Sequence, residues 1–338
     1  MIPTSTGCTT ARKRLKWGNH LAQGYRKPRY DVEGLKAVKL ELQTAGGSRA
    51  TLLPERGGLL SSLALKSADG MSRDVLWLSH QFDLRESGWP AGGMPLMFPF
   101  AGRVFHGLTP FQYELAGKIW QMPLHGFAYA HKWRVVAADD RTAVLSLHTS
   151  DASRQLFPFD FDLKVKYTLN DTSLLIDTEV SCLGAHSPLA PRMPMALGWH
   201  PYFYLPKWQG SVDATARLQT SAQIQLPVTA IGGAGKPTAF PGSSLPDHQV
   251  LHQAHLSNLI LGDLKSDQAL VEFPASGYAI ALGWDPSYRY LVLWTQSGQE
   301  FHCVEPWMGL PDALNNGAGL RWLAPSESHR SRVTIGIL

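Results

Sequence analysis

The strongest constraint on the fold of this 338-residue chain is an alternation of apolar and polar side chains with a period of two residues. It is clearest over residues 159–169, where large apolar residues occupy every second position and Asp or Lys stands at 160, 162, 164 and 166. This pattern predicts a strand with one buried face, because successive side chains of a strand point to opposite sides. After a turn at residues 170–173 the alternation resumes from Leu174 to Cys182, which predicts an antiparallel hairpin.

Similar short alternating runs recur along the chain, at residues 38–42, 278–284, 291–293 and 333–337. The 31 Gly and 23 Pro residues interrupt the sequence so often that no long segment keeps an apolar stripe at helical spacing. We find no internal repeat of fixed length. Many short strands with turn signals between them predict an all-β fold, a sandwich or barrel, and not alternating βαβ units.

The chain has enough apolar residues, 44% of the total, to build a sizeable core. We expect residues 36–338 to form a single large domain, since all-β domains often exceed the average domain size. The glycine-rich stretch at 232–246 has alternating runs on both sides, so we interpret it as an insertion in that domain. We expect residues 1–35 to form an N-terminal arm.

Charge and cysteine content exclude several classes of protein. The net charge of +4 is small and spread along the chain, and the one dense basic run, residues 12–16, has no apolar helical face beside it. We therefore expect a solvated arm, with no nucleic-acid or membrane partner. There is no membrane-spanning apolar run and no signal-like apolar stretch in residues 1–18, and the three cysteines are well separated. These features predict a cytoplasmic protein.

Two segments place a cation or an imidazole beside glycine, proline and aromatic residues. Arg103 ends an apolar, turn-rich run over residues 92–103. Its planar guanidinium suits either an internal ion pair or the vicinal hydroxyls of a ligand, and the residues alone leave these alternatives balanced. His125 precedes Gly126 and Phe127. For an isolated histidine in such a place, a buried ring satisfied by the backbone is the better interpretation.

Two further segments carry titratable groups on strand-like stretches. If residues 196–203 form a strand, His200 shares a face with Tyr202 and, upstream, with small residues. Leu197, Trp199 and Phe203 share the opposite, bulky face, which favours a ligand site at His200. Glu305 ends an alternating run on an apolar face. A carboxylate there is either ion-paired with an arginine or partly desolvated, and desolvation would raise its pKa and make it a better base.

Taken together and in order, these segments resemble the aldose 1-epimerase (galactose mutarotase) family. The resemblance covers the chain from about residue 36 to the C-terminus. Gly57-Gly58 before the segments and Leu323-Ala324-Pro325 after them fit it as well. Its main motifs are Gly93-Met94-Pro95 with Phe98-Pro99-Phe100-Ala101-Gly102-Arg103, then His125-Gly126-Phe127-Ala128, Gly198-Trp199-His200-Pro201-Tyr202-Phe203, and Cys303-Val304-Glu305-Pro306-Trp307.

The resemblance implies a large antiparallel β-sandwich of the galactose mutarotase type and an isomerase that interconverts the α and β anomers of an aldose. It assigns Glu305 as the base for the anomeric hydroxyl and His200 as the acid for the ring oxygen. It implies that Arg103 and His125 bind the sugar, and we add Trp307 and Phe127 from the same motifs. The reaction requires neither a metal nor another cofactor, because no hydride moves and no water is consumed.

Two departures from the family concern the sugar rather than the acid–base pair. Ser257 and Asn258 stand where the family has a sugar-binding acid, with Asp263 nearby but out of register, and Gly102 stands where galactose mutarotases have Asn before the arginine. The alternatives are a hexose-phosphate 1-epimerase, which would need extra basic groups such as Arg192 or Arg217 at the site, and a non-catalytic sugar-binding protein. The sequence does not identify the sugar or the oligomeric state.

Overall fold

The computed structural model describes residues 29–32, 35–185, 190–208, 211–212, 216–240, 249–251 and 257–338. Most of the predicted N-terminal arm, including the basic run at 12–16, lies outside the described residues. The described end of that arm forms a two-stranded hairpin of β1 (Arg29–Val32) and β2 (Leu35–Val38). The division into an arm and one domain therefore stays a prediction.

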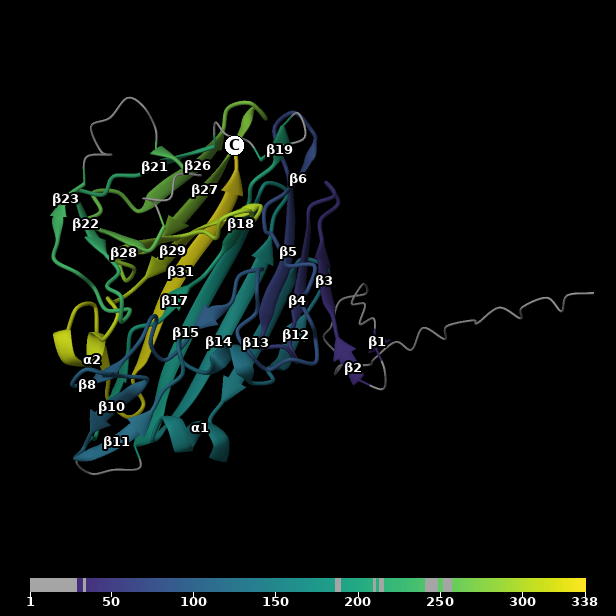
Figure 1. Cartoon of the computed structure of the whole chain (residues 1–338). Helices are drawn as coiled ribbons and strands as arrows, with labels where there is room; N and C mark the ends of the chain where they lie inside the picture. Colours follow the sequence, from purple (N-terminus) through teal and green to yellow (C-terminus); the bar gives the residue numbers. More distant parts are fainter. Residues whose placement is uncertain are drawn as a thin grey trace, which may run out of the picture.

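The largest sheet of the described chain has nine antiparallel strands, and its long members lie side by side in Figure 1. In spatial order the strands are β12 (Arg134–Ala138), β13 (Thr142–His148), β14 (Phe159–Leu169), β15 (Ser173–Ala185), β31 (Ser328–Ile337), β27 (Tyr278–Trp284), β26 (Gln268–Phe273), β21 (Arg217–Gln219) and β24 (Gln249–Val250).

A second sheet of eight strands carries the segments that the sequence singled out. Its order is β23 (Thr238–Ala239), β22 (Ile224–Pro227), β25 (Leu259–Gly262), β28 (Tyr290–Trp294), β29 (Phe301–Trp307), β17 (Gly198–Trp199) and β7 (Leu96–Met97), with β18 (Tyr202–Tyr204) also paired to β29. The all-β prediction is confirmed.

Smaller elements complete the described chain. A four-stranded sheet contains β3 (Leu40–Gln43), β4 (Arg49–Leu53), β5 (Leu59–Lys66) and β6 (Ser72–Asp74). Two-stranded pairs are β8 (Phe105–His106) with β9 (Thr109–Pro110), β10 (Gln112–Leu115) with β11 (Lys118–Gln121), β16 (Met193–Met195) with β30 (Arg321–Leu323), and β19 (Lys207–Trp208) with β20 (Ser211–Val212). The helices are η1 (Ala128–Ala130), α1 (Asp151–Leu156) and α2 (Ala313–Asn316). None of the helices within the described ranges has the length and apolarity to cross a membrane.

The predicted hairpin is confirmed as β14 and β15, which pair along their whole length from Leu169↔Leu174 to Phe159↔Ala185. Along β14 the apolar positions are buried and the positions between them are partly or fully exposed. One face of this sheet therefore supplies the core, and the other faces solvent.

The core lies between the two large sheets. Phe161 of β14 packs against Phe98, just after β7, with ring centroids 5.1 Å apart, and Tyr167 of β14 meets the edge of Trp199 in β17 at 6.4 Å. All four rings are buried. These contacts join the nine-stranded sheet to the segment around His200, so the bulky face predicted for residues 197–203 is turned to the core and His200 to the opposite side.

Candidate active site

The register of the eight-stranded sheet brings His200 and Glu305 together. β17 pairs with β29 at Gly198↔Trp307, and β18 pairs with the same strand at Tyr202↔Cys303. Midway between these two pairs His200 lies opposite Glu305, and its Nε2 is 3.2 Å from the Glu305 Oε1. Two segments far apart in the sequence thus become cross-strand neighbours.

The strands around this contact are less regular than the sequence suggested. Residues 196–203 do not form one strand: β17 ends at Trp199 and β18 begins at Tyr202, and the break lies at His200-Pro201. Glu305 does not end its strand either, because β29 continues to Trp307. All seven residues of β29 are buried, so both of its faces are covered and Glu305 is held in a dry environment.

Burial sets the protonation of the pair. The side chains of His200 and Glu305 are only 6% and 1% exposed. Burial raises the pKa of Glu305 well above its usual value, and the hydrogen bond from Trp307 opposes this shift to a smaller extent. Burial also lowers the pKa of His200 well below its usual value, and the nearby His125 lowers the pKa of His200 further. The pair therefore holds one exchangeable proton over a wide pH range, shared between Nε2 and Oε1.

Trp307 orients the carboxyl group of Glu305. Its Nε1 donates to Oε2 at 2.9 Å, while Oε1 faces His200, so each carboxyl oxygen has its own partner. The indole lies against Gly102, where an added Cβ would come within 2.9 Å of the Trp307 Cζ3. The glycine found in place of the family's asparagine therefore leaves room for this ring.

His125 lies beside the pair on a tight turn. It has φ of +64° and Gly126 has φ of +75°, and a Cβ at Gly126 would come within 2.0 Å of the Phe98 carbonyl oxygen. The Gly102 amide donates to the His125 Nδ1 at 3.1 Å, which leaves the proton on Nε2. Burial, and secondarily the charge of Arg103, lowers the pKa of His125 to about 3, so the ring is a neutral donor.

Arg103 lies at the edge of this group. Its Nη1 donates to the Ile231 carbonyl oxygen at 2.7 Å, and its guanidinium lies 5.3 Å from the centre of the Phe111 ring. Within the described part of the chain, the Arg103 Nε is buried and has no hydrogen-bond partner. This leaves a donor available to a bound molecule.

Phe127 is the one predicted site residue that lies apart from the others. Its side chain is buried in the main core, with its ring 5.9 Å from Phe98 and 5.9 Å from Phe161. Because this ring packs in the core behind His125, we leave Phe127 out of the proposed sugar site.

Several aromatic residues that sequence reasoning missed line the same region. The Tyr202 ring stacks on the imidazole of His200 at 4.7 Å, and the rings of Trp294 and Trp89 lie 6.0 and 5.2 Å from it. The sequence placed Tyr202 on the same face as His200, but we did not predict it as a site residue. Trp89 and Trp294 belong to other segments, and only the fold brings them here.

One group of side chains could in principle hold a metal. Donor atoms of His200, Cys303 and Glu305 lie within 4.8 Å of one another, and these are ligand types that zinc uses. Burial, and secondarily the neighbouring Glu305, raises the pKa of the Cys303 thiol well above its usual value in the metal-free protein. Two of the three groups already contact each other, since His200 Nε2 lies 3.2 Å from Glu305 Oε1. We assign no metal to this group.

The residues at the positions of departure have structural partners. The Ser257 hydroxyl donates to the Thr295 carbonyl oxygen at 3.0 Å, and Asp263 binds Lys265 at 2.7 Å. The basic residues considered for phosphate binding are engaged as well: Arg217 pairs with Glu272 of the nine-stranded sheet at 2.8 Å. Arg192 donates to the Trp322 carbonyl oxygen at 2.8 Å.

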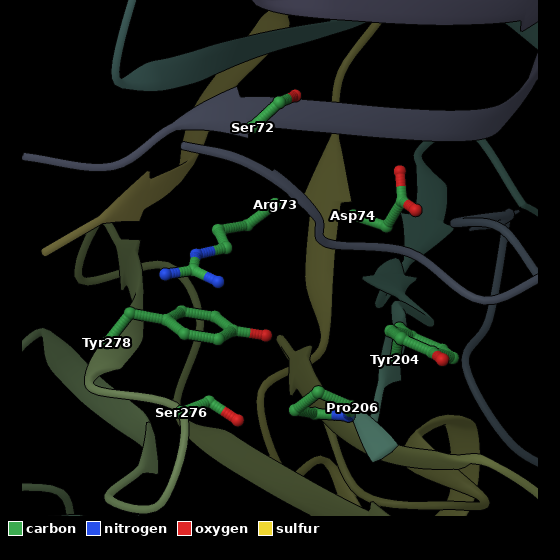
Figure 2. Close-up of a pocket in the computed structure, with 7 residues that line it drawn as sticks. All are labelled: Ser72, Arg73, Asp74, Tyr204, Pro206, Ser276 and Tyr278. Carbon is green, nitrogen blue, oxygen red and sulfur yellow. The ribbon is translucent and has the colours of Figure 1, made fainter. Parts of the chain in front are cut away.

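A separate hollow of about 300 Å³ lies elsewhere on the molecule (Figure 2). Its lining residues are Ser72, Arg73, Asp74, Tyr204, Pro206, Ser276 and Tyr278. The Arg73 guanidinium lies over the Tyr278 ring, 5.0 Å from its centre, and binds Asp69 at 2.6 Å. None of the predicted site residues lines this hollow, so it is distinct from the group around Glu305.

Comparison with known proteins gives a consistent result. The family model for aldose 1-epimerase matches residues 39–336. Protein LacX (chromosomal) of Lactococcus lactis subsp. lactis is 24% identical over 280 residues, which cover 77% of this chain and 85% of LacX. Among solved structures, the Slr1438 protein of Synechocystis sp. PCC 6803 is 26% identical with a TM-score of 0.75, over 91% of this chain and 99% of that one. A galactose mutarotase-like protein of Lactobacillus casei ATCC 334 is 24% identical with a TM-score of 0.71, over 89% and 100%.

Proposed function

Because this chain belongs to the aldose 1-epimerase family, we propose that it interconverts the α and β anomers of an aldose, with Glu305 and His200 as its acid–base pair. Glu305 removes the proton from the anomeric hydroxyl while His200 donates a proton to the ring oxygen, and the C1–ring oxygen bond breaks to leave the open-chain aldehyde. Rotation about the C1–C2 bond and closure with the proton transfers reversed produce the other anomer.

The observation that carries this proposal is the buried contact between His200 Nε2 and Glu305 Oε1. Ring opening needs a base and an acid on either side of one carbon, with one proton available between them. The raised pKa of Glu305 and the lowered pKa of His200 place the shared proton on the carboxyl group in the sugar-free protein. The proposed reaction therefore starts with transfer of that proton from Glu305 Oε1 to His200 Nε2, which leaves a carboxylate to accept the anomeric proton and an imidazolium to protonate the ring oxygen. The net protonation of the enzyme is the same before and after each turnover.

We assign the sugar contacts to His125 and Arg103. The neutral His125 ring presents its Nε2 proton to a hydroxyl or to the ring oxygen, and Arg103 offers its Nε, which has no partner among the described residues, while its Nη1 stays on the Ile231 carbonyl oxygen. The two candidate phosphate-binding residues, Arg192 and Arg217, have partners of their own. We therefore favour a neutral sugar over a sugar phosphate.

A catalytically silent sugar-binding protein is the second class to exclude. Binding alone does not require a desolvated carboxyl group in contact with an imidazole, and burying that pair is costly.

We also place the protein in the cytoplasm, because Cys182 and Cys303 are buried free thiols.

The test is the rate at which anomers equilibrate. Freshly dissolved α-D-glucose, α-D-galactose, other aldoses and hexose phosphates would be followed by polarimetry or by NMR saturation exchange. We expect the wild type to accelerate equilibration of at least one neutral aldose, and Glu305→Gln and His200→Asn each to lose about 10²–10⁴-fold.

The variants also separate the alternatives. If wild type and variants equilibrate no sugar faster than buffer, the epimerase proposal fails. If only phosphorylated sugars respond, the hexose-phosphate alternative replaces it. Sugar binding that is retained without any catalysis would instead identify a binding protein.

A further inference from the structure

Trp89 makes close contacts with the candidate active site from a segment outside the motifs. The centre of its ring lies 4.5 Å from that of His125, 5.2 Å from that of His200 and 4.9 Å from that of Tyr129. Its Nε1 donates to the Tyr202 hydroxyl at 2.9 Å. The indole thus bridges the two histidines and is tethered to the ring that stacks on one of them.

The indole lies over groups that a sugar must reach. Glu305 and His200 have almost no accessible surface, and His125 is only 9% exposed. Trp89 itself is partly exposed and follows an exposed stretch at residues 85–88. A pyranose that contacts both imidazoles needs the space that this flat ring occupies between them and the exterior.

We propose that Trp89 is a displaceable cover of the sugar site, and that a sugar must push its indole off His125 and His200 before catalysis. This inference rests on the proposed function. It assigns an access-determining role to a residue of the segment between β6 and β7. It also implies that the fraction of molecules with the cover open limits the apparent affinity for sugar.

The backbone around Trp89 is built to hold this cover in place. Arg56, which is 95% buried, donates from Nη2 to the Gly88 carbonyl oxygen at 2.8 Å, next to Trp89 in the chain. On the other side, the Ser79 amide donates to the Ala91 carbonyl oxygen at 2.9 Å. The segment is thus anchored at both ends, so a rotation of the indole about its side-chain bonds is enough to uncover the histidines.

The first test needs no sugar. Diethylpyrocarbonate modifies accessible imidazoles, and mass spectrometry reads each histidine separately. We expect His125 and His200 to react about tenfold faster in Trp89→Ala than in the wild type, with exposed His80 unchanged as the internal standard. Trp322→Ala, which removes a surface indole from β30, is the matched control and should leave every rate unchanged.

The second test uses the aldose that the wild type equilibrates fastest. If the sugar displaces the indole, Trp89→Ala lowers KM severalfold, because the cover no longer competes with the sugar. Trp89→Phe keeps most of the ring but loses the hydrogen bond to Tyr202, so it should lower KM by less. Thermal unfolding measurements check that both variants are folded. If Trp89→Ala does not fold, Trp89→Phe still provides the test.

Equal labelling of His125 and His200 in the wild type and both Trp89 variants would overturn the proposal. A raised KM would also overturn it, since it would mean that the indole stays and binds the sugar. If the wild type equilibrates no aldose at all, the proposed function fails, while the labelling experiment still decides whether Trp89 covers the histidines.

Discussion

The β14–β15 hairpin and the β17–β18–β29 region are both antiparallel and both contribute to the core, but they are built differently. β14 and β15 pair over eleven and thirteen residues with one buried face. β17 and β18 contain two and three residues, are separated by His200-Pro201, and lie against a strand that is buried throughout. The regular hairpin provides stability, whereas the broken strands place a polar pair where water is excluded.

This comparison predicts that replacing the buried carboxyl group of Glu305 costs activity and increases stability. Glu305→Gln should lose about 10²–10⁴-fold in kcat/KM, because the amide cannot act as a base. The same change should raise the free energy of unfolding by about 1 kcal/mol, since a carboxyl group no longer has to be buried. Chemical denaturation measures the free energy of unfolding. The double variant His200→Asn/Glu305→Gln should be no less active than the less active of the two single variants. A destabilised Glu305→Gln would contradict the view that the pair is costly to bury.

A substitution in the core of the β14–β15 hairpin should have the opposite effect: it should lower stability and leave activity unchanged. Phe161→Ala removes a buried ring that packs on Phe98, and we expect a loss of about 3–5 kcal/mol in the free energy of unfolding. Below its melting temperature the remaining folded protein should keep a wild-type kcat/KM, because Phe161 lies in the core and not beside the proposed acid–base pair. Comparison of activity per folded molecule with the denaturation curve measures this. A large fall in kcat/KM would show that the two regions are coupled.

Substitution of Gly102 tests whether the position of the Trp307 ring controls the placement of the Glu305 carboxyl group. Both Gly102 and Gly107 have positive φ, +78° and +59°, so alanine is strained at either position, but only at Gly102 would a Cβ meet the Trp307 ring. We expect Gly102→Ala to lower kcat/KM by about tenfold or more, because displacing Trp307 misplaces Glu305. Gly107→Ala, where a Cβ has open space, should cost similar stability and leave kcat/KM unchanged. Equal activities of the two variants would show that the position of Trp307 is unimportant.

The regular β14–β15 hairpin was easier to predict from the sequence than the broken strands around His200. The alternation at residues 159–182 predicted the hairpin, because in a regular strand local polarity reports burial directly. The faces around His200 were also predicted correctly, but the break at His200-Pro201 and the continuation of β29 past Glu305 were not, since every residue of β29 is buried and no alternation marks its end.

The contacts of the site were harder still to predict. The pairing of His200 with Glu305 depends on a register between distant strands. The contact of Trp89 with both histidines depends on how a loop folds back over them. No local pattern encodes either, whereas the motifs did identify four residues that the fold brings together: His125, His200, Glu305 and Trp307.

The smallest expected effect concerns acid stability, to which His125 contributes together with the other buried histidine of the site, His200. The ordinary pKa of His125 is 6.5 and the folded protein lowers it to about 3, so protonation favours unfolding. The stabilisation is fully present above pH 6.5 and is lost as the pH falls towards 3, by about 1 kcal/mol for the first unit. His125→Asn keeps a residue that tolerates positive φ and removes the titration, so its stability should fall less between pH 7 and 5.5. If His125→Asn keeps the wild-type slope, the acid sensitivity comes from other groups, and the neutral donor role of His125 loses its support.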